Sequence, residues 1–315
     1  MKRLRLALLA AVTGAALGLA GVGWVFAGII LKPDRALSRI EAYGPELLPL
    51  REAADRTGGG AFAVRSGLGY ELKGLHFRSR PANSRFVVLV HGYGMDLTQY
   101  RDLIPMWLGM GFDVFAYDQC DSGLSGGRFI TCGVNESVDL GSVVTFARTR
   151  VAPGALCGVL GRSMGGAVVL LYAGRGGPCD FVVSECPFTS FHEEALYRMG
   201  IDYPFIPRFL GPVVWDAAAA AARLRAGIAL GDADPLAHVA RVPSPLLFIN
   251  TAEDRFVPTS MTQRLFDLAS APKRLRVFPR GGHAQAFAFY PEEYRSDVAS
   301  FLRDLVGSPP TLPAR

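Results

Sequence analysis

Three residues far apart in the chain have the types and the order of a nucleophile, an acid and a base. Ser163 lies at the centre of Gly161-Arg162-Ser163-Met164-Gly165-Gly166, which follows the apolar stretch Gly158-Val159-Leu160 and precedes a helical run. Glycines two positions before and after the serine let the chain turn sharply from a strand into a helix and expose the side chain. The motif therefore predicts Ser163 as the nucleophile of an acyl-transfer reaction.

A serine hydroxyl is a poor nucleophile until a base removes its proton. His283 follows the last predicted strand and precedes the last predicted helix, so its loop should open at the same edge of the sheet as Ser163. The other four histidines fit an early strand, the turn after the next strand, the region 188–235 and a helix: His76, His91, His192 and His238. His283 is the predicted general base.

Asp254 is the predicted third member, which holds the imidazole in one tautomer and stabilises its charged form. It lies in a short loop directly after an apolar strand. Ser163, Asp254 and His283 then follow the chain order in which a strand–turn–helix nucleophile meets its acid and its base. Glu253 and Glu185 are the alternative carboxylates.

A developing oxyanion needs backbone N–H donors aimed at it. Met164 supplies one by its position after the nucleophile. The turn His91-Gly92-Tyr93-Gly94 follows a predicted strand, and its glycines let the backbone approach closely, so the N–H of Tyr93 is the predicted second donor. The alternative is a tight turn without a catalytic part.

The elements that would position these residues alternate between short apolar runs and longer amphipathic ones. This alternation predicts an α/β fold whose largely parallel sheet is covered by helices on both faces. Strands are expected at about 70–78, 85–90, 112–118, 156–161, 180–185, 245–251 and 274–279. Helices are expected at about 97–110, 135–150, 163–175, 259–270 and 291–306.

The alternation fails between about 188 and 235, which predicts a small helical cap above the carboxyl edge of the sheet, where ligands of open α/β sheets bind. Its apolar residues would form a wall for an acyl chain: Phe188, Tyr203, Phe205 and Trp215 are the predicted substrate-binding residues. The alternative is a packing elaboration without contact to substrate.

The N-terminal segment carries no charge from Leu6 to Leu31, and about 20 such residues suffice to cross a membrane. Residues 1–31 are therefore predicted as a single-pass anchor, with a signal peptide cleaved near Gly18-Leu19-Ala20 or a buried soluble helix as alternatives. The basic cluster at the very start favours a catalytic domain outside the cytoplasm. Residues 32–65 are expected to be a juxtamembrane connector, 66–306 the catalytic domain and 307–315 a tail.

The formal net charge is +5, and three of the positive charges lie in the first five residues. No later stretch has the dense basic pattern that nucleic-acid binding requires, so no nucleic-acid partner is expected. The five cysteines lack metal-ligand spacing, and buried reduced thiols are favoured over a disulfide: Cys120, Cys132, Cys157, Cys179 and Cys186.

At these residues the chain closely resembles the α/β-hydrolase superfamily, in particular its membrane-anchored serine-aminopeptidase-like and prolyl-oligopeptidase-related branch. The likeness covers roughly residues 70–306. It is carried by the turn at 91–94, the loop 117–126, the helix start 133–140, the serine motif, the loop 254–258 and Gly282-His283-Ala284. One departure is Gln119-Cys120-Asp121-Ser122, where relatives often carry Arg-x-His-Gly beneath the oxyanion turn.

The resemblance implies an eight-stranded, mostly parallel sheet, no cofactor and no metal, and a two-step mechanism through an acyl-serine. A small-molecule carboxylic ester or lipid-like acyl compound is the expected substrate, and the lipid membrane the expected partner of the N-terminal helix. A thioesterase or a serine peptidase with the same triad remains open. So does a catalytically silent, membrane-anchored binding protein.

Overall fold

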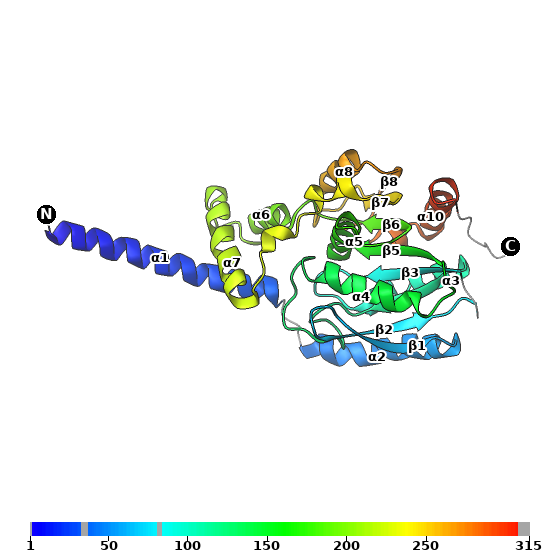
Figure 1. Cartoon of the computed structure of the whole chain (residues 1–315). Helices are drawn as coiled ribbons and strands as arrows, with labels where there is room; N and C mark the ends of the chain where they lie inside the picture. The colour runs from blue at the N-terminus through cyan, green and yellow to red at the C-terminus, as the bar shows by residue number, and fades with distance from the viewer. Residues whose placement is uncertain (1, 33–36, 81–83, 308–315) are drawn as a thin grey trace.

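The computed structural model describes residues 2–32, 37–80 and 84–307, and their centre is one eight-stranded sheet (Figure 1). The strand order is β1-β2-β4-β3-β5-β6-β7-β8, in which β1 and β2 pair antiparallel to their neighbours and the rest run parallel. The strands are β1 Gly60–Arg65, β2 Glu71–Phe77, β3 Arg85–Val90, β4 Asp113–Tyr117, β5 Leu156–Arg162, β6 Phe181–Glu185, β7 Leu246–Thr251 and β8 Lys273–Phe278. This architecture confirms the predicted fold class.

Helices cover both faces of the sheet. The α-helices of the described residues are α1 Lys2–Leu31, α2 Leu37–Arg56, α3 Leu103–Gly109, α4 Glu136–Arg148, α5 Met164–Gly174, α6 Phe191–Asp202, α7 Gly211–Ala226, α8 Thr259–Leu268, α9 Ala286–Phe289 and α10 Pro291–Leu305. One core cluster joins the sheet to α4, α5 and α8, and a second joins its other face to α2, α3 and α10. The central strands β3 to β7 are almost wholly buried because helices shield them on both sides.

The segment 32–65 is not the connector expected from the sequence. It contains α2, which packs Leu50 and Ala54 against the sheet, and β1, which adds an antiparallel edge strand to β2. The exposed and half-buried residues of β1 alternate, as they do in an edge strand with one covered face. The sheet domain therefore begins before residue 66, while the predicted tail lies outside the described residues apart from Gly307.

The predicted cap lies between β6 and β7 and consists mainly of α6 and α7, the latter containing the alanine-rich run (Figure 1). Ser190 starts α6 by accepting a hydrogen bond from the N–H of Glu193. Gly227 ends α7 in the left-handed conformation. A third, smaller apolar cluster joins this cap to the last turns of α1.

The helix α1 runs out from the domain, and its last turns lie against α7 (Figure 1). Thr13–Leu31 has a mean hydropathy of 2.0 and is long and apolar enough to span a membrane. All five cysteines are free thiols.

Candidate active site

Ser163 occupies the sharp turn that its motif predicts. It has φ 56° and ψ −121° between the end of β5 and the start of α5, a conformation that is strained for a residue with a Cβ. The turn is crowded by backbone: a Cβ at Gly165 would overlap the carbonyl group of Val90, and one at Gly161 would overlap that of Gly165. Only glycine fits these two positions, because the sharp turn between β5 and α5 brings each of them directly against neighbouring backbone.

A buried ion pair fixes the base of this turn. The N–H of Ser163 donates to the carbonyl of Glu185 at 2.8 Å. Arg162 Nε donates to the Glu185 carboxylate at 2.7 Å, and the hydroxyl of Tyr294 donates to the same oxygen at 3.1 Å. Glu185 forms its ion pair with Arg162 below the turn, so it is not placed to orient a histidine.

Asp254 and His283 meet in the loops after β7 and β8. The Asp254 carboxylate accepts a hydrogen bond from His283 Nδ1 at 2.8 Å through Oδ2. Its Oδ1 accepts the N–H groups of Phe256 at 2.9 Å and Val257 at 3.0 Å, which fix its orientation. The neighbouring Glu253 points elsewhere and accepts the N–H of Gly281 at 3.0 Å.

The second ring nitrogen of His283 is free to act as a base. Nε2 is buried and has no hydrogen-bond partner among the described residues, Ser163 included. The Sγ atom of Cys186 lies within 4.8 Å of the ring and of the Asp254 carboxylate. Burial lowers the pKa of the imidazole, whereas the hydrogen bond to Asp254 and the charge of that carboxylate raise it, and the pKa of His283 ends above its ordinary value.

The turn after β3 lies against the serine. A Cβ on Gly92 would lie 3.4 Å from the Cβ of Ser163, so the backbone passes close to the nucleophile. Within the described residues, no acceptor is recorded for the N–H of Tyr93 or of Met164. Both donors therefore remain available, which is the condition for the predicted oxyanion pair.

Gln119 supports this turn at the position where the sequence departs from its relatives. Its side-chain amide donates to the carbonyl of His91 at 2.6 Å. Its backbone N–H donates to Nε2 of the His91 ring at 2.9 Å, and Nδ1 of the ring lies 2.9 Å from the carbonyl of Gly92. His91 and Gln119 therefore support the turn from below.

The remaining histidines are occupied elsewhere. His76 pairs with Asp113 at 2.9 Å on the sheet. His192 stacks obliquely on Trp215 in the cap, with ring centroids 5.0 Å apart. His238 lies in the short turns before β7.

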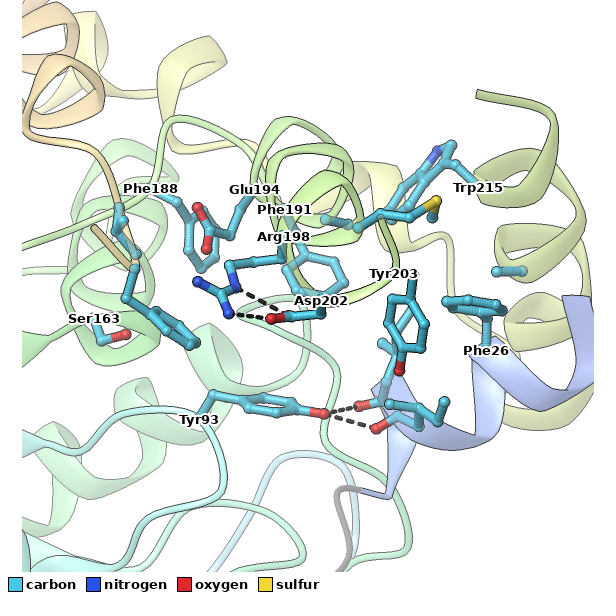
Figure 2. A pocket seen from close by; sticks show the side chains of 17 residues that line it. Phe26, Tyr93, Ser163, Phe188, Phe191, Glu194, Arg198, Asp202, Tyr203 and Trp215 are labelled. Carbon is cyan, nitrogen blue, oxygen red and sulfur yellow. Dashed lines mark hydrogen bonds and ion pairs between the residues drawn. The ribbon is translucent and has the colours of Figure 1, made fainter. Parts of the chain in front are cut away.

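Ser163 opens into a mostly apolar cavity beneath the cap, of about 210 Å³ (Figure 2). Of the predicted substrate-binding residues, Phe188, Tyr203 and Trp215 line it. Phe205, the fourth predicted residue, is 78% exposed and does not line this cavity.

Residues 81–218 match the protein family described as "Serine aminopeptidase, S33". The uncharacterised protein YqkD of Bacillus subtilis is 30% identical over 312 residues, which cover 97% of this chain and 98% of that protein. A solved esterase of Pyrococcus furiosus superposes with a TM-score of 0.64 at 22% identity, over 79% of this chain and 92% of the esterase. This chain belongs to the α/β-hydrolase superfamily.

One further relative of this hydrolase and one further solved structure bear the names of activities. The monoacylglycerol lipase of Mycolicibacterium smegmatis is 28% identical over 226 residues, or 61% of this chain and 79% of the lipase. The acylaminoacyl peptidase of Pyrococcus horikoshii shares the fold, with a TM-score of 0.61 at 18% identity over 79% of this chain and 42% of the peptidase.

Several residues of the hydrolase's cavity escaped the sequence prediction. Phe26, Ile29 and Ile30 come from the end of α1, for which an isolated apolar run gives no signal of a binding role. Glu194 and Arg198 come from α6, and they share one helix face because they are four residues apart (Figure 2).

Glu194 is an unusual lining residue. It is 5% exposed, and both carboxylate oxygens are buried without a partner among the described residues. Burial raises its pKa to about 8, which the charges of His283 and Arg198 oppose. At neutral pH the group is therefore mainly a neutral carboxylic acid that can both donate and accept a hydrogen bond inside the cavity.

Proposed function

We propose that this hydrolase cleaves carboxylic esters of small acyl compounds through an acyl-serine intermediate. The observation that carries the proposal is the imidazole of His283. Asp254 holds one ring nitrogen, and the other is buried and unpartnered in a loop that opens at the same sheet edge as Ser163. The apolar lining of the adjoining cavity favours an acyl chain over a charged peptide.

In the first half-reaction, Ser163 Oγ attacks the ester carbonyl and its proton passes to His283 Nε2. The N–H groups of Tyr93 and Met164 receive the oxyanion, and Asp254 stabilises the imidazolium. His283 then gives its proton to the leaving alkoxide, and the alcohol departs. In the second half-reaction, water attacks the acyl-serine with His283 as base, which releases the carboxylic acid and restores the serine.

The named activity of the mycobacterial relative supports an ester substrate, and the S33 match keeps amide cleavage as the alternative. A fluorophosphonate probe tests the nucleophile. Labelling is expected for the full-length protein and for Ser122→Ala, whose hydroxyl lies outside the cavity, and is expected to vanish in Ser163→Ala. A folded wild type that stays unlabelled would instead favour a silent binding protein.

Paired model substrates separate the reaction types. We expect p-nitrophenyl acetate to be hydrolysed at least about a hundredfold faster than p-nitroacetanilide, since the amide has the poorer leaving group and the cavity lining is mostly apolar. An amide rate equal to the ester rate would move the assignment to a peptidase.

We further propose that α1 is a single-pass membrane anchor with the catalytic domain outside the cytoplasm. The uncharged run from Leu6 to Leu31, which is longer than one membrane crossing needs, and the basic cluster at the start of the chain support this arrangement. Protease added to intact cells should then degrade the catalytic domain. Degradation only after permeabilisation would reverse the orientation.

A further inference from the structure

The last turns of α1 are part of the cavity wall. Phe26, Ile29 and Ile30 face the space that Ser163 also lines (Figure 2). The hydroxyl of Tyr93 lies within hydrogen-bond distance of the carbonyls of Ile29 and Ile30, at 2.8 and 2.9 Å. These carbonyls at the helix end have no partner within the helix, so the oxyanion turn closes the end of α1.

The same part of α1 is locked to the cap. A Cβ on Gly23 would lie 2.5 Å from the backbone of Ala217 in α7, so the two helices touch at a glycine. Arg225 of α7 donates to the carbonyl of Trp24 at 3.0 Å, and its guanidinium lies over the indole ring at 4.9 Å. Phe26 meets Tyr203 edge to face at 5.0 Å. The anchor and the cap therefore form one body around the cavity.

The length of α1 places the membrane surface next to this body. From Leu6 to Trp24 the helix measures about 28 Å at about 1.5 Å per residue, close to the ~30 Å of a bilayer core. Trp24 is 52% exposed, and tryptophan prefers the membrane–water interface. Residues 26 to 30 then lie just above the hydrocarbon, at the level of the cavity.

The cap exposes large apolar side chains in the segment that leads into α7. α7 crosses α1 on the side of the domain from which the N-terminal part of α1 runs out (Figure 1). Phe205 and Phe209, in the segment that leads into α7, are 78% and 76% exposed. Large aromatic rings with most of their surface exposed are suited to the interfacial layer of a bilayer.

We propose that the anchor helix completes the acyl site and that the cavity receives its substrate from the bilayer, so that the substrate class is a single-chain lipid ester. This inference rests on the proposed esterase function and on the proposed anchor. The acyl chain leaves the membrane along α1, lies against Phe26, Ile29 and Ile30, and presents its ester to Ser163. A cavity of about 210 Å³ is smaller than the ~300–1,000 Å³ of drug-sized sites, which favours one chain over two.

The test compares one substitution at two places on α1. Ile29→Trp fills the cavity wall, whereas Val25→Trp places the same bulk one turn earlier at a side chain that is 60% exposed and does not line the cavity. Full-length protein is reconstituted in phosphatidylcholine vesicles that contain 1-monolauroylglycerol. Release of lauric acid is measured beside hydrolysis of water-soluble p-nitrophenyl acetate and labelling by the fluorophosphonate.

We expect Ile29→Trp to reduce kcat/KM for monolauroylglycerol at least about tenfold, since displacing two methylene groups from an apolar site has about that effect. Its hydrolysis of p-nitrophenyl acetate should fall less than its lipid hydrolysis, because an acetyl group fills less of the cavity, and both activities of Val25→Trp should stay within about twofold of wild type. Equal rates of lipid hydrolysis in the two variants, or an equal loss on both substrates in Ile29→Trp, would overturn the inference.

The membrane-facing side has its own test. Phe205→Ser with Phe209→Ser should reduce hydrolysis of the vesicle lipid at least about fivefold and leave p-nitrophenyl acetate unaffected, because interfacial contact is lost while the cavity is intact. Leu268→Ser, an exposed leucine of α8, is the matched control. A wild type that cleaves p-nitrophenyl acetate but not the vesicle lipid would overturn the inference and leave the esterase proposal standing. An unlabelled wild type would overturn both.

Discussion

Replacing Asp254 by asparagine tests the triad most directly, because the hydrogen bonds of this residue determine how an amide must be oriented. Oδ1 accepts two backbone N–H groups, those of Phe256 and Val257. In the variant only the amide oxygen can accept them, so the NH₂ group must face His283. This NH₂ group is a donor and cannot pair with an Nδ1 that carries its own proton, so the imidazole proton moves to Nε2. That nitrogen then no longer accepts the proton of Ser163.

We expect Asp254→Asn to lower kcat about 10⁴-fold, the effect of a wrong histidine tautomer in a serine triad. At about 1.36 kcal/mol per tenfold change, this corresponds to about 5.5 kcal/mol of lost transition-state stabilisation. The assay is steady-state hydrolysis of p-nitrophenyl acetate, with circular dichroism to establish that the variant is folded.

Glu253→Gln is the matched control for this prediction. The glutamine oxygen can still accept the N–H of Gly281, so the activity should stay within about twofold of wild type. A folded Asp254→Asn that keeps more than about a tenth of the activity, or a Glu253→Gln that loses as much, would refute the assignment of Asp254.

Three further substitutions probe the turn, the base and the cap. Gly165→Ala should destabilise the fold by at least about 3 kcal/mol, seen as a lower Tm, since the new methyl group overlaps the backbone of Val90. Cys186→Ala should leave the acid limb of the pH profile of kcat/KM in place, because burial raises the pKa of the Cys186 thiol and a neutral thiol brings no charge to His283; a limb shifted to lower pH would contradict this. Burial raises the pKa of Glu194 to about 8, so the folded protein holds this proton more tightly than the unfolded chain does. The stabilising contribution of Glu194 to the Tm of the wild type should therefore decrease as the pH rises from about 4.5 to about 8. The Glu194→Gln variant should lack this pH-dependent contribution to Tm.

The sheet and its helices could be predicted because each depends on a local pattern. Strands β3 to β7 are continuous apolar runs between turn residues, and the helices from α4 onward that flank them carry their own periodicity. The serine turn could be predicted for a similar reason, since Gly161 and Gly165 are required by clashes that any residue with a Cβ would cause. Steric requirements of this kind are visible in a single sequence.

The first strand and its preceding helix could not be found in this way. β1 has only six residues, none of which is fully buried, and α2 contains Pro45 and Pro49 inside the helix, so neither element gives a strong local signal. What stabilises them is packing of Leu50 and Ala54 on the sheet. The predicted connector was wrong because this packing is tertiary.

The cap and its cavity depend even more on contacts between distant segments. Phe205 is as aromatic as Tyr203, yet one ring is exposed and the other lines the cavity, where it meets Phe26 of α1. Composition predicted an apolar wall but could not decide which rings form it. Contacts with α1 determine which rings line the cavity, and the contact between Phe26 and Tyr203 joins residues nearly 180 positions apart in the chain.

Tyr93 connects these two levels of organisation. Its backbone N–H was predicted from the glycines around it, which is a local argument, while its hydroxyl reaches the carbonyls of Ile29 and Ile30 at the end of α1. The turn with the proposed oxyanion donor and the helix that contributes to the cavity wall are therefore held by one side chain. Because the hydrogen bonds of Tyr93 hold the end of α1 at the wall of the cavity that Ser163 lines, α1 is a structural part of the domain, and its removal should change hydrolysis as well as any membrane attachment.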